Sequence, residues 1–173
     1  MANVTLSYIL YDTVVYGATA NAESILFQTI SGADATHNEQ FTNARGAGVL
    51  PQTEDFIIKK ISAVVDKALA KADLVPLFNG SILEIRITDF TVIKAPMALF
   101  IDATAFSGAV LEAAAVDTIA AGLMGDGYEL AHPIHLPGAT PFKVRVLQGP
   151  AVTAGTNVKI ALHGDYTMAG QGF

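Results

Sequence analysis

The clearest pattern in this sequence is the stretch Asn79-Gly80-Ser81-Ile82-Leu83-Glu84-Ile85-Arg86-Ile87-Thr88-Asp89-Phe90. Its first two residues form a turn dipeptide, because asparagine and glycine both tolerate the positive φ of tight turns. The side chains that follow alternate between aliphatic and polar, and a period of two places each kind on its own face of a strand. This pattern predicts a central, half-buried antiparallel strand, with Leu83, Ile85 and Ile87 in the core and Glu84 and Arg86 facing outward.

Alternation of the same kind recurs along the chain and predicts that this strand belongs to a larger sheet. Residues 142–146 and 158–162 repeat it, and their predicted core-facing side chains are Phe142, Val144, Val146, Val158, Ile160 and Leu162. Further strands are expected at residues 4–11, 25–30, 97–101 and 128–135. Turn residues separate most of these segments, which is typical of antiparallel β-structure.

Residues 51–74 fit two structures. Their apolar side chains recur at a spacing of three and four, which favours an amphipathic helix. The β-branched residues of the segment also suit a strand, whose inner face would be formed by Ile57, Ile61 and Val65. We predict a strand over residues 55–65 and a helix over residues 66–73.

The whole pattern predicts an all-β protein. Residues 106–123 are rich in alanine and fit a helix or a buried strand, and we predict a helix within a long connection. Helices do not alternate regularly with strands, which argues against a βαβ fold. We predict a single jelly-roll barrel or sandwich of about eight antiparallel strands, with one or two short helices in its connections. One domain should span residues 1–173, with a loose C-terminal tail around residues 168–173.

The composition suggests that the surface is partly covered by other subunits. Apolar residues make up 51% of the chain and charged residues 15%, against a usual charged share of about 25%. A chain this poor in charge cannot cover its whole surface with charged groups. It is therefore expected either to hide apolar surface in an assembly or to build large sheets that are covered on both faces.

The same composition excludes several classes of function. The formal net charge is −6 and no dense basic run occurs, which argues against sequence-independent binding of nucleic acid. The absence of cysteine excludes disulfides, thiolate catalysis and cysteine-ligated zinc. No signal peptide is expected at the N-terminus. No charge-free apolar run reaches the ~18 residues of a membrane span, so a soluble or peripheral protein is expected.

The residues that most often carry chemistry form no convincing site. A jelly-roll metal enzyme of the cupin kind needs histidines two apart on one strand, whereas His132 and His135 are three apart. The adjacent carboxylates Glu54 and Asp55 fit a strand or helix start, where negative charge is favourable. No serine occupies a Gly-x-Ser-x-Gly elbow. We therefore predict no catalytic residue, no cofactor and no metal site.

Four lysines within a short segment have two explanations. They can form the solvated side of an amphipathic element, or they can contact an anionic surface such as lipid headgroups, at about 1 kcal/mol per basic group. The residues concerned are Lys59, Lys60, Lys67 and Lys71.

Three landmarks, in this order, resemble a known family. They are Leu50-Pro51 ahead of residues 54–61, residues 78–87 followed by Ala95-Pro96, and residues 130–138 leading into residues 142–146. Together they resemble the jelly-roll major capsid proteins of tailless icosahedral viruses that carry an internal membrane. In length, apolar character and lack of cysteine the chain is most similar to the small major capsid proteins of tailless Thermus bacteriophages.

This resemblance implies a structural protein without enzyme activity. The family implies one upright β-barrel that packs beside copies of itself and beside a larger second capsid protein. It also implies a thermophilic host, and a location in the virion, in a shell over a lipid membrane that encloses double-stranded DNA, after synthesis in the host cytoplasm. A dimer or larger capsomer is expected, without direct contact to the nucleic acid.

Two other classes of function stay open. The first is a jelly-roll module that binds carbohydrate or another small ligand in a concave site with convergent polar groups. The second, which the histidine spacing disfavours, is a cupin-type metalloprotein.

Overall fold

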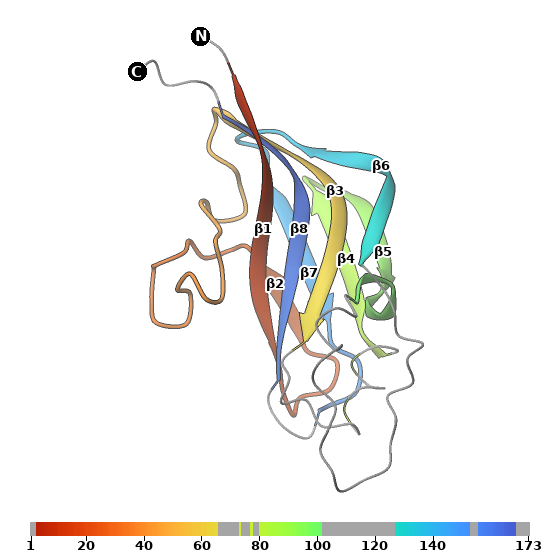
Figure 1. Cartoon of the computed structure of the whole chain (residues 1–173). Helices are drawn as coiled ribbons and strands as arrows, with labels where there is room; N and C mark the ends of the chain where they lie inside the picture. Colours follow the sequence, from red (N-terminus) through yellow and green to blue (C-terminus); the bar gives the residue numbers. More distant parts are fainter. Residues whose placement is uncertain are drawn as a thin grey trace, which may run out of the picture.

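In the part of the chain that the structure describes, eight β-strands form two facing sheets (Figure 1). The computed structural model describes residues 3–65, 73, 77, 80–101, 127–152 and 156–168. The strands are β1 (Val4–Tyr16), β2 (Glu23–Leu26), β3 (Glu54–Val65), β4 (Ile82–Ile87), β5 (Phe90–Pro96), β6 (Tyr128–Leu136), β7 (Phe142–Leu147) and β8 (Thr156–Met168), with a 3₁₀ helix, η1 (Met97–Phe100).

The strand order is that of a jelly roll. One sheet has the order β1-β8-β3-β6 and the other β2-β7-β4-β5, and every named pair is antiparallel. The first strand therefore pairs with the last, the second with the seventh, the third with the sixth and the fourth with the fifth. This is a long eight-strand hairpin rolled into two sheets. The predicted all-β jelly-roll fold is confirmed.

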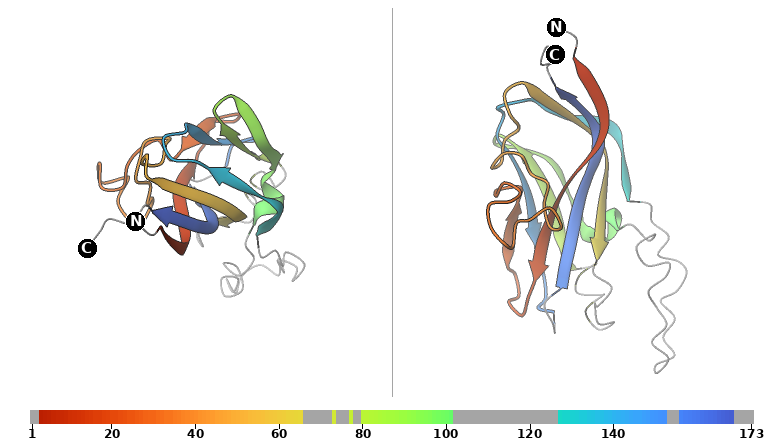
Figure 2. Two further views of the ribbon diagram at one scale, coloured as in Figure 1. Left: turned by 90° about the horizontal axis from the view of Figure 1, so that it is seen from above. Right: turned by 60° about the vertical axis from the view of Figure 1, so that its left-hand side comes forward.

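The core lies between the two sheets, as the two layers in Figure 2 show. Eight of the nine predicted core side chains are buried, and they come from strands of both sheets: Leu83, Ile85, Phe142, Val144, Val146, Val158, Ile160 and Leu162. The ninth, Ile87, is half-buried because it sits at the end of β4, where the strand leaves the sandwich. Each buried aliphatic contributes roughly 1.5–3 kcal/mol.

A β-bulge in β3 decides which of its residues face the core. The strand expected at residues 55–65 is present, and its pairing with β8 shifts register between Ile58 and Lys60. Phe56 and Ile58 point inward before the bulge, and Ile61 points inward after it. Ile57 is exposed, so the inner face expected from Ile57, Ile61 and Val65 is wrong at Ile57. A bulge adds one residue to one strand, which the alternation of side chains alone does not reveal.

The central strand predicted within residues 79–90 is present as β4, but it ends before Phe90, and a hairpin turn follows it. β4 ends at Ile87, Thr88 adopts a positive φ of 54° in the turn, and β5 begins at Phe90. The Thr88 amide donates to the Pro141 carbonyl at 2.8 Å, which holds this turn against the loop between β6 and β7. Sequence reasoning missed β5 because threonine rarely adopts a positive φ.

The strand expected at residues 97–101 is also wrong. Residues 97–100 form the 3₁₀ helix η1, in which side chains three apart share a face. Met97 and Phe100 are buried accordingly, while Leu99 is 52% exposed. The helices predicted over 66–73 and 106–123 lie outside the described residues, apart from Asp73. The predicted loose tail also lies outside them, apart from Met168, the last residue of β8.

A buried carboxylate interrupts the inward face of β1. Asp12 lies between Leu10 and Val14 in the row of core-facing residues and is 6% exposed. Its two oxygens accept the Phe27 amide at 2.5 Å and the Thr13 amide at 2.8 Å. Phe27 is buried with a positive φ of 61°. Asp12 therefore anchors the chain where it leaves β2.

The stability of the fold should depend on pH through Asp12. Burial raises the pKa of Asp12, against the hydrogen bonds from Phe27 and Thr13, which lower it. The folded state thus binds the proton more tightly than the unfolded state, and the contribution of Asp12 to stability falls as pH rises above about 3.8. We expect Asp12→Asn to gain stability relative to the wild type as pH rises through this range. Urea unfolding of both proteins at a series of pH values measures their free energies of unfolding. If Asp12→Asn instead lost stability relative to the wild type as pH rises, the expectation would be contradicted.

Candidate assembly surface and polar pocket

Exposed apolar side chains concentrate at the edges of the two sheets. Among the described residues eleven large apolar side chains are exposed, and the four edge strands β1, β2, β5 and β6 carry eight of them. These are Val4, Leu6, Ile9, Val15, Ile25, Phe90, Val92 and Tyr128. Of the four central strands only β3 adds one, Ile57. The apolar surface therefore lies along the sides of the barrel, where the sheets end.

The middle of the β1 edge is covered by the loop that carries Asn43. β1 has thirteen residues, and its only charged residue, Asp12, is buried. The Asn43 side chain accepts the Tyr11 backbone amide at 2.7 Å and donates to the Ile9 carbonyl at 2.7 Å. The Asn43 backbone amide donates to the Tyr11 carbonyl at 3.1 Å. Asn43 thus takes the place of a neighbouring strand. Covering an edge with a loop is one way in which proteins prevent sheets from pairing edge to edge.

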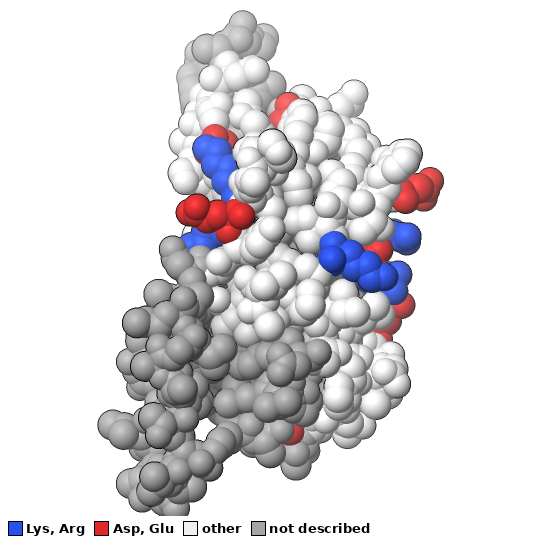
Figure 3. Space-filling model, turned by 90° about the vertical axis from the view of Figure 1, so that its right-hand side faces the viewer, with Lys and Arg blue, Asp and Glu red and all other residues white. Residues whose placement is uncertain are grey.

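The most exposed aromatic side chain among the described residues lies on the opposite side of the barrel. β5 and β6 lie on one side of the molecule, with η1 close to both (Figure 1). We call this the β5–β6 side and define it by Phe90, Val92, Leu99 and Tyr128, whose exposed fractions are 76%, 41%, 52% and 41%. Figure 3 views the molecule from this side, and most of the described surface there is uncharged. This surface is candidate contact area, because exposed apolar patches mark interaction sites.

Glu84 lies on the outer face of its sheet and is nevertheless buried. The Arg86 Nε is 2.9 Å and the Arg145 Nη1 is 3.9 Å from its carboxylate, and the Thr91 hydroxyl donates to it at 2.9 Å. Its side chain is 4% exposed. Glu84 therefore lies on the outward face as predicted, but two arginines and a threonine cover it, so its carboxylate is not exposed to solvent. Arg86, 41% exposed, does face outward.

The adjacent carboxylates Glu54 and Asp55 form no catalytic pair. As neighbours on a strand they point to opposite faces. Glu54 is buried, accepts the Tyr166 hydroxyl and lies 3.1 Å from the Arg45 guanidinium. Asp55 is exposed and accepts the Gly138 amide at 3.0 Å. Each carboxylate therefore has a structural partner of its own.

The histidines are dispersed over the molecule. His37 pairs with Asp34 at 2.8 Å, His163 is bonded to the Ser62 hydroxyl at 2.8 Å, and His135 lies 3.6 Å from Asp55. His132 is exposed on β6. Within the described residues no three metal-binding side chains come together.

Only part of the lysine cluster can be located. The bulge in β3 turns Lys59 and Lys60 to the outside together. Lys59 pairs with Asp165 on β8 at 2.6 Å, which neutralises it at the surface. Lys67 and Lys71 lie outside the described residues.

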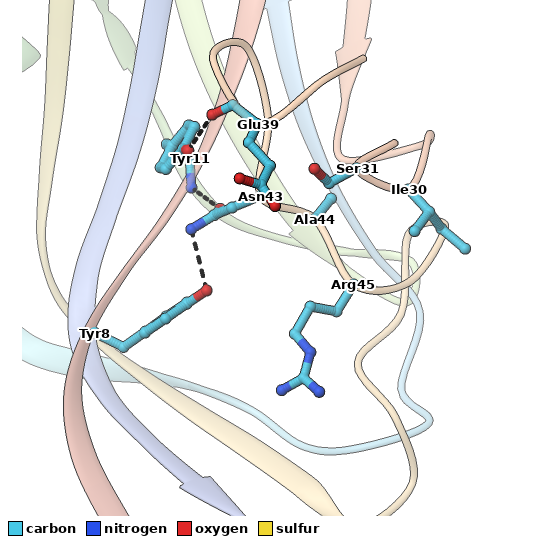
Figure 4. A pocket seen from close by; sticks show the side chains of 8 residues that line it. All are labelled: Tyr8, Tyr11, Ile30, Ser31, Glu39, Asn43, Ala44 and Arg45. Atoms are coloured by element: carbon cyan, nitrogen blue, oxygen red, sulfur yellow. Dashed lines mark hydrogen bonds between the residues drawn. The ribbon is translucent and has the colours of Figure 1, made fainter. Parts of the chain in front are cut away.

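A polar pocket of about 530 Å³ lies between β1 and the loop that leads to β3 (Figure 4). Its polar side chains come from both segments and are Tyr8, Tyr11, Ser31, Glu39, Asn43 and Arg45. Ile30 and Ala44 complete the lining. Sequence reasoning missed this pocket, because its two segments are about thirty residues apart and neither has a motif.

Comparison with known proteins identifies no relative. No family model, no curated protein and no solved structure matches the chain. In the described part of the chain, no helix has the length and apolarity to span a membrane.

Proposed function

We propose that this protein is a structural subunit of a viral shell, a major capsid protein that associates with copies of itself. The observation that carries the proposal is the placement of exposed apolar side chains on the edge strands of a jelly roll. An upright barrel in a shell meets its neighbours along its sides, so its apolar surface is needed there. The sequence resemblance supports the same conclusion.

The proposed contact is the β5–β6 side. β5 is an edge strand whose seven residues contain one charged side chain, Lys94, and which exposes Phe90 and Val92. On the other side of the barrel, Asn43 and its loop already cover the middle of the β1 edge. Of the two sides, the described residues therefore leave the β5–β6 side more open to a second copy of the chain.

The other partners follow from the resemblance. They are a second, larger capsid protein and a membrane beneath the shell, in a virion that encloses double-stranded DNA. Lys59 and Lys60 would contribute to a membrane contact only by giving up the partners that they have within the subunit.

Replacing Phe90 by lysine should weaken self-association and leave the fold intact. A side chain that is 76% exposed can be changed without loss of core packing, whereas its burial between subunits is worth about 1.5–3 kcal/mol. We expect the dissociation constant of the assembly to rise at least about tenfold. Light scattering over a range of protein concentrations, with electron microscopy of the particles, measures this.

The control is Val15→Lys. Val15 is a similarly exposed apolar residue, 64% exposed, but it lies on β1. An equal effect of both substitutions would argue against the β5–β6 side as the contact. A wild-type protein that is strictly monomeric at every concentration, alone and with candidate capsid partners, would contradict the assembly proposal itself.

A further inference from the structure

We propose that the pocket between β1 and the loop that follows β2 is a binding site for a neutral, hydroxyl-rich ligand, a saccharide. The proposal is independent of subunit assembly, because the pocket lies on the side of the barrel opposite the β5–β6 side. Its volume of about 530 Å³ falls within the ~300–1,000 Å³ of small-molecule sites.

The pocket contains a hydroxyl group that has no partner in the protein. The Ser31 Oγ is shielded from solvent and makes no hydrogen bond. In Figure 4 it points toward the part of the pocket where Asn43 and Glu39 lie. A buried hydroxyl without a partner loses the hydrogen bonds that it would make in water. Rotation of the Ser31 side chain about its Cα–Cβ bond would bring this hydroxyl to the pocket. A ligand there that supplies both a donor and an acceptor would then restore the lost hydrogen bonds.

The two tyrosines offer complementary hydrogen-bonding groups. The Tyr11 hydroxyl donates to the Glu39 carbonyl at 2.5 Å, so its oxygen remains as an acceptor. The Tyr8 hydroxyl accepts the Asn43 side-chain amide at 3.2 Å, so its proton is left to donate. A tyrosine hydroxyl is protonated at neutral pH in any case, and burial raises the pKa of Tyr11 further. A ligand hydroxyl can serve both kinds of group, because it donates and accepts at once.

The charges around the pocket cancel one another. Arg45 is paired with Glu54 at 3.1 Å. Glu39 is negative, and Lys159, whose Nζ lies 4.8 Å from the centre of the Tyr11 ring, is positive. Two positive and two negative groups attract neither an anion nor a cation by net charge. This balance favours a neutral ligand over a phosphate, a carboxylate or an ammonium group.

The pocket is preorganised by Asn43, the residue that also bonds to the edge of β1. Its side chain is bonded to the Tyr11 amide, the Ile9 carbonyl and the Tyr8 hydroxyl. Tyr8 also packs against Tyr166, with ring centres 5.2 Å apart. Groups fixed before the ligand arrives lose little conformational freedom on binding.

The test is a titration of the isotope-labelled full chain, followed by the shifts of its backbone amide signals in NMR spectra. The probes are methyl α-glucoside, methyl α-mannoside, methyl β-galactoside and N-acetylglucosamine. Inorganic phosphate, N-acetylneuraminate and choline serve as charged probes. We expect at least one neutral sugar to shift the amides of Tyr11, Ser31 and Ala44, and to do so more strongly than the charged probes.

Ser31→Ala tests most directly whether the Ser31 hydroxyl contributes to sugar binding. Because its Oγ is buried without a partner in the protein, the substitution should not lower stability, and it should weaken sugar binding about threefold to tenfold, the effect of one neutral hydrogen bond. Tyr8→Phe should weaken binding to a similar extent while it keeps the ring. Ser7→Ala, the same chemical change at an exposed position of β1 outside the pocket, should bind as the wild type does.

Three outcomes would overturn the proposal. The first is that no neutral sugar shifts the pocket amides at concentrations up to about 50 mM, a weak affinity even for a single sugar. The second is that only phosphate, N-acetylneuraminate or choline binds there. The third is that a sugar binds with an affinity that neither Ser31→Ala nor Tyr8→Phe changes.

Discussion

Ile85→Asp is expected to prevent folding. Ile85 is completely buried in the centre of β4, opposite Ile93 on β5 and Val144 on β7. The substitution loses about 1.5–3 kcal/mol of apolar burial and places a carboxylate in the core without a partner, at a further cost of several kcal/mol. Together these approach the roughly 5–15 kcal/mol by which a domain is stable. The expected result is insoluble protein, or a soluble chain without β-sheet circular dichroism.

Two variants on the same strand serve as controls. Ile85→Val keeps an apolar side chain at the site and should cost only about 0.5–1.5 kcal/mol. Arg86→Ala should fold with a loss of about 1–2 kcal/mol, because buried Glu84 loses one ion pair but keeps Arg145 and Thr91. If Ile85→Asp folds normally, the Ile85 side chain does not lie in the core between the two sheets.

Gly164→Ala is expected to have the second-largest effect. Gly164 lies in the centre of β8, opposite Tyr8 on β1 and Ile58 on β3. A Cβ atom at this position would overlap the Ile57 carbonyl oxygen and lie 2.8 Å from its carbonyl carbon. These are backbone atoms of the neighbouring strand, so no side-chain rotation relieves the overlap. Separating β3 from β8 there would cost about 3 kcal/mol or more.

Denaturant unfolding of Gly164→Ala beside Gly17→Ala measures this cost. A Cβ atom at Gly17 would have no atom within 4 Å, so that substitution should change stability by less than about 1 kcal/mol. The midpoint for Gly164→Ala should therefore fall far below both the wild type and the control. Equal midpoints for the two variants would mean that β3 and β8 are not paired in this register.

Strand alternation was sufficient to predict the fold class, because inward-facing residues here are mostly apolar and the turns mostly contain Gly, Pro or Asn. It succeeded on β7 and β8, where Phe142 and Ile160 are core residues. It failed where one residue departs from the rule. Thr88 forms a turn with positive φ, a conformation that the sequence predicts only where glycine or asparagine occurs. The bulge before Lys60 changes which residues of β3 face inward.

The burial of charged residues could not be predicted from the pattern. Asp12 interrupts an apolar row because Phe27, fifteen residues away, needs an acceptor for its amide. Glu84 looks like a solvent-facing residue, and its burial is explained by its partners Arg86, Arg145 and Thr91. The pocket depends in the same way on Asn43 meeting β1. Each feature rests on a contact between segments that are distant in sequence, and alternation contains no information about such contacts.

The pairing of the first strand with the last has a consequence for how the chain is made. Val4 lies opposite Met168, and Tyr16 opposite Thr156. During synthesis β1 therefore leaves the ribosome long before β8, and its partner does not exist until β2 to β7 have also been made. Contacts of such long range close large loops and form slowly. Until then β1 is a long apolar strand with one charge, prone to pair with other chains. Productive folding should therefore be fastest at low concentration of nascent chains, and dependent on chaperones when the protein is made in quantity.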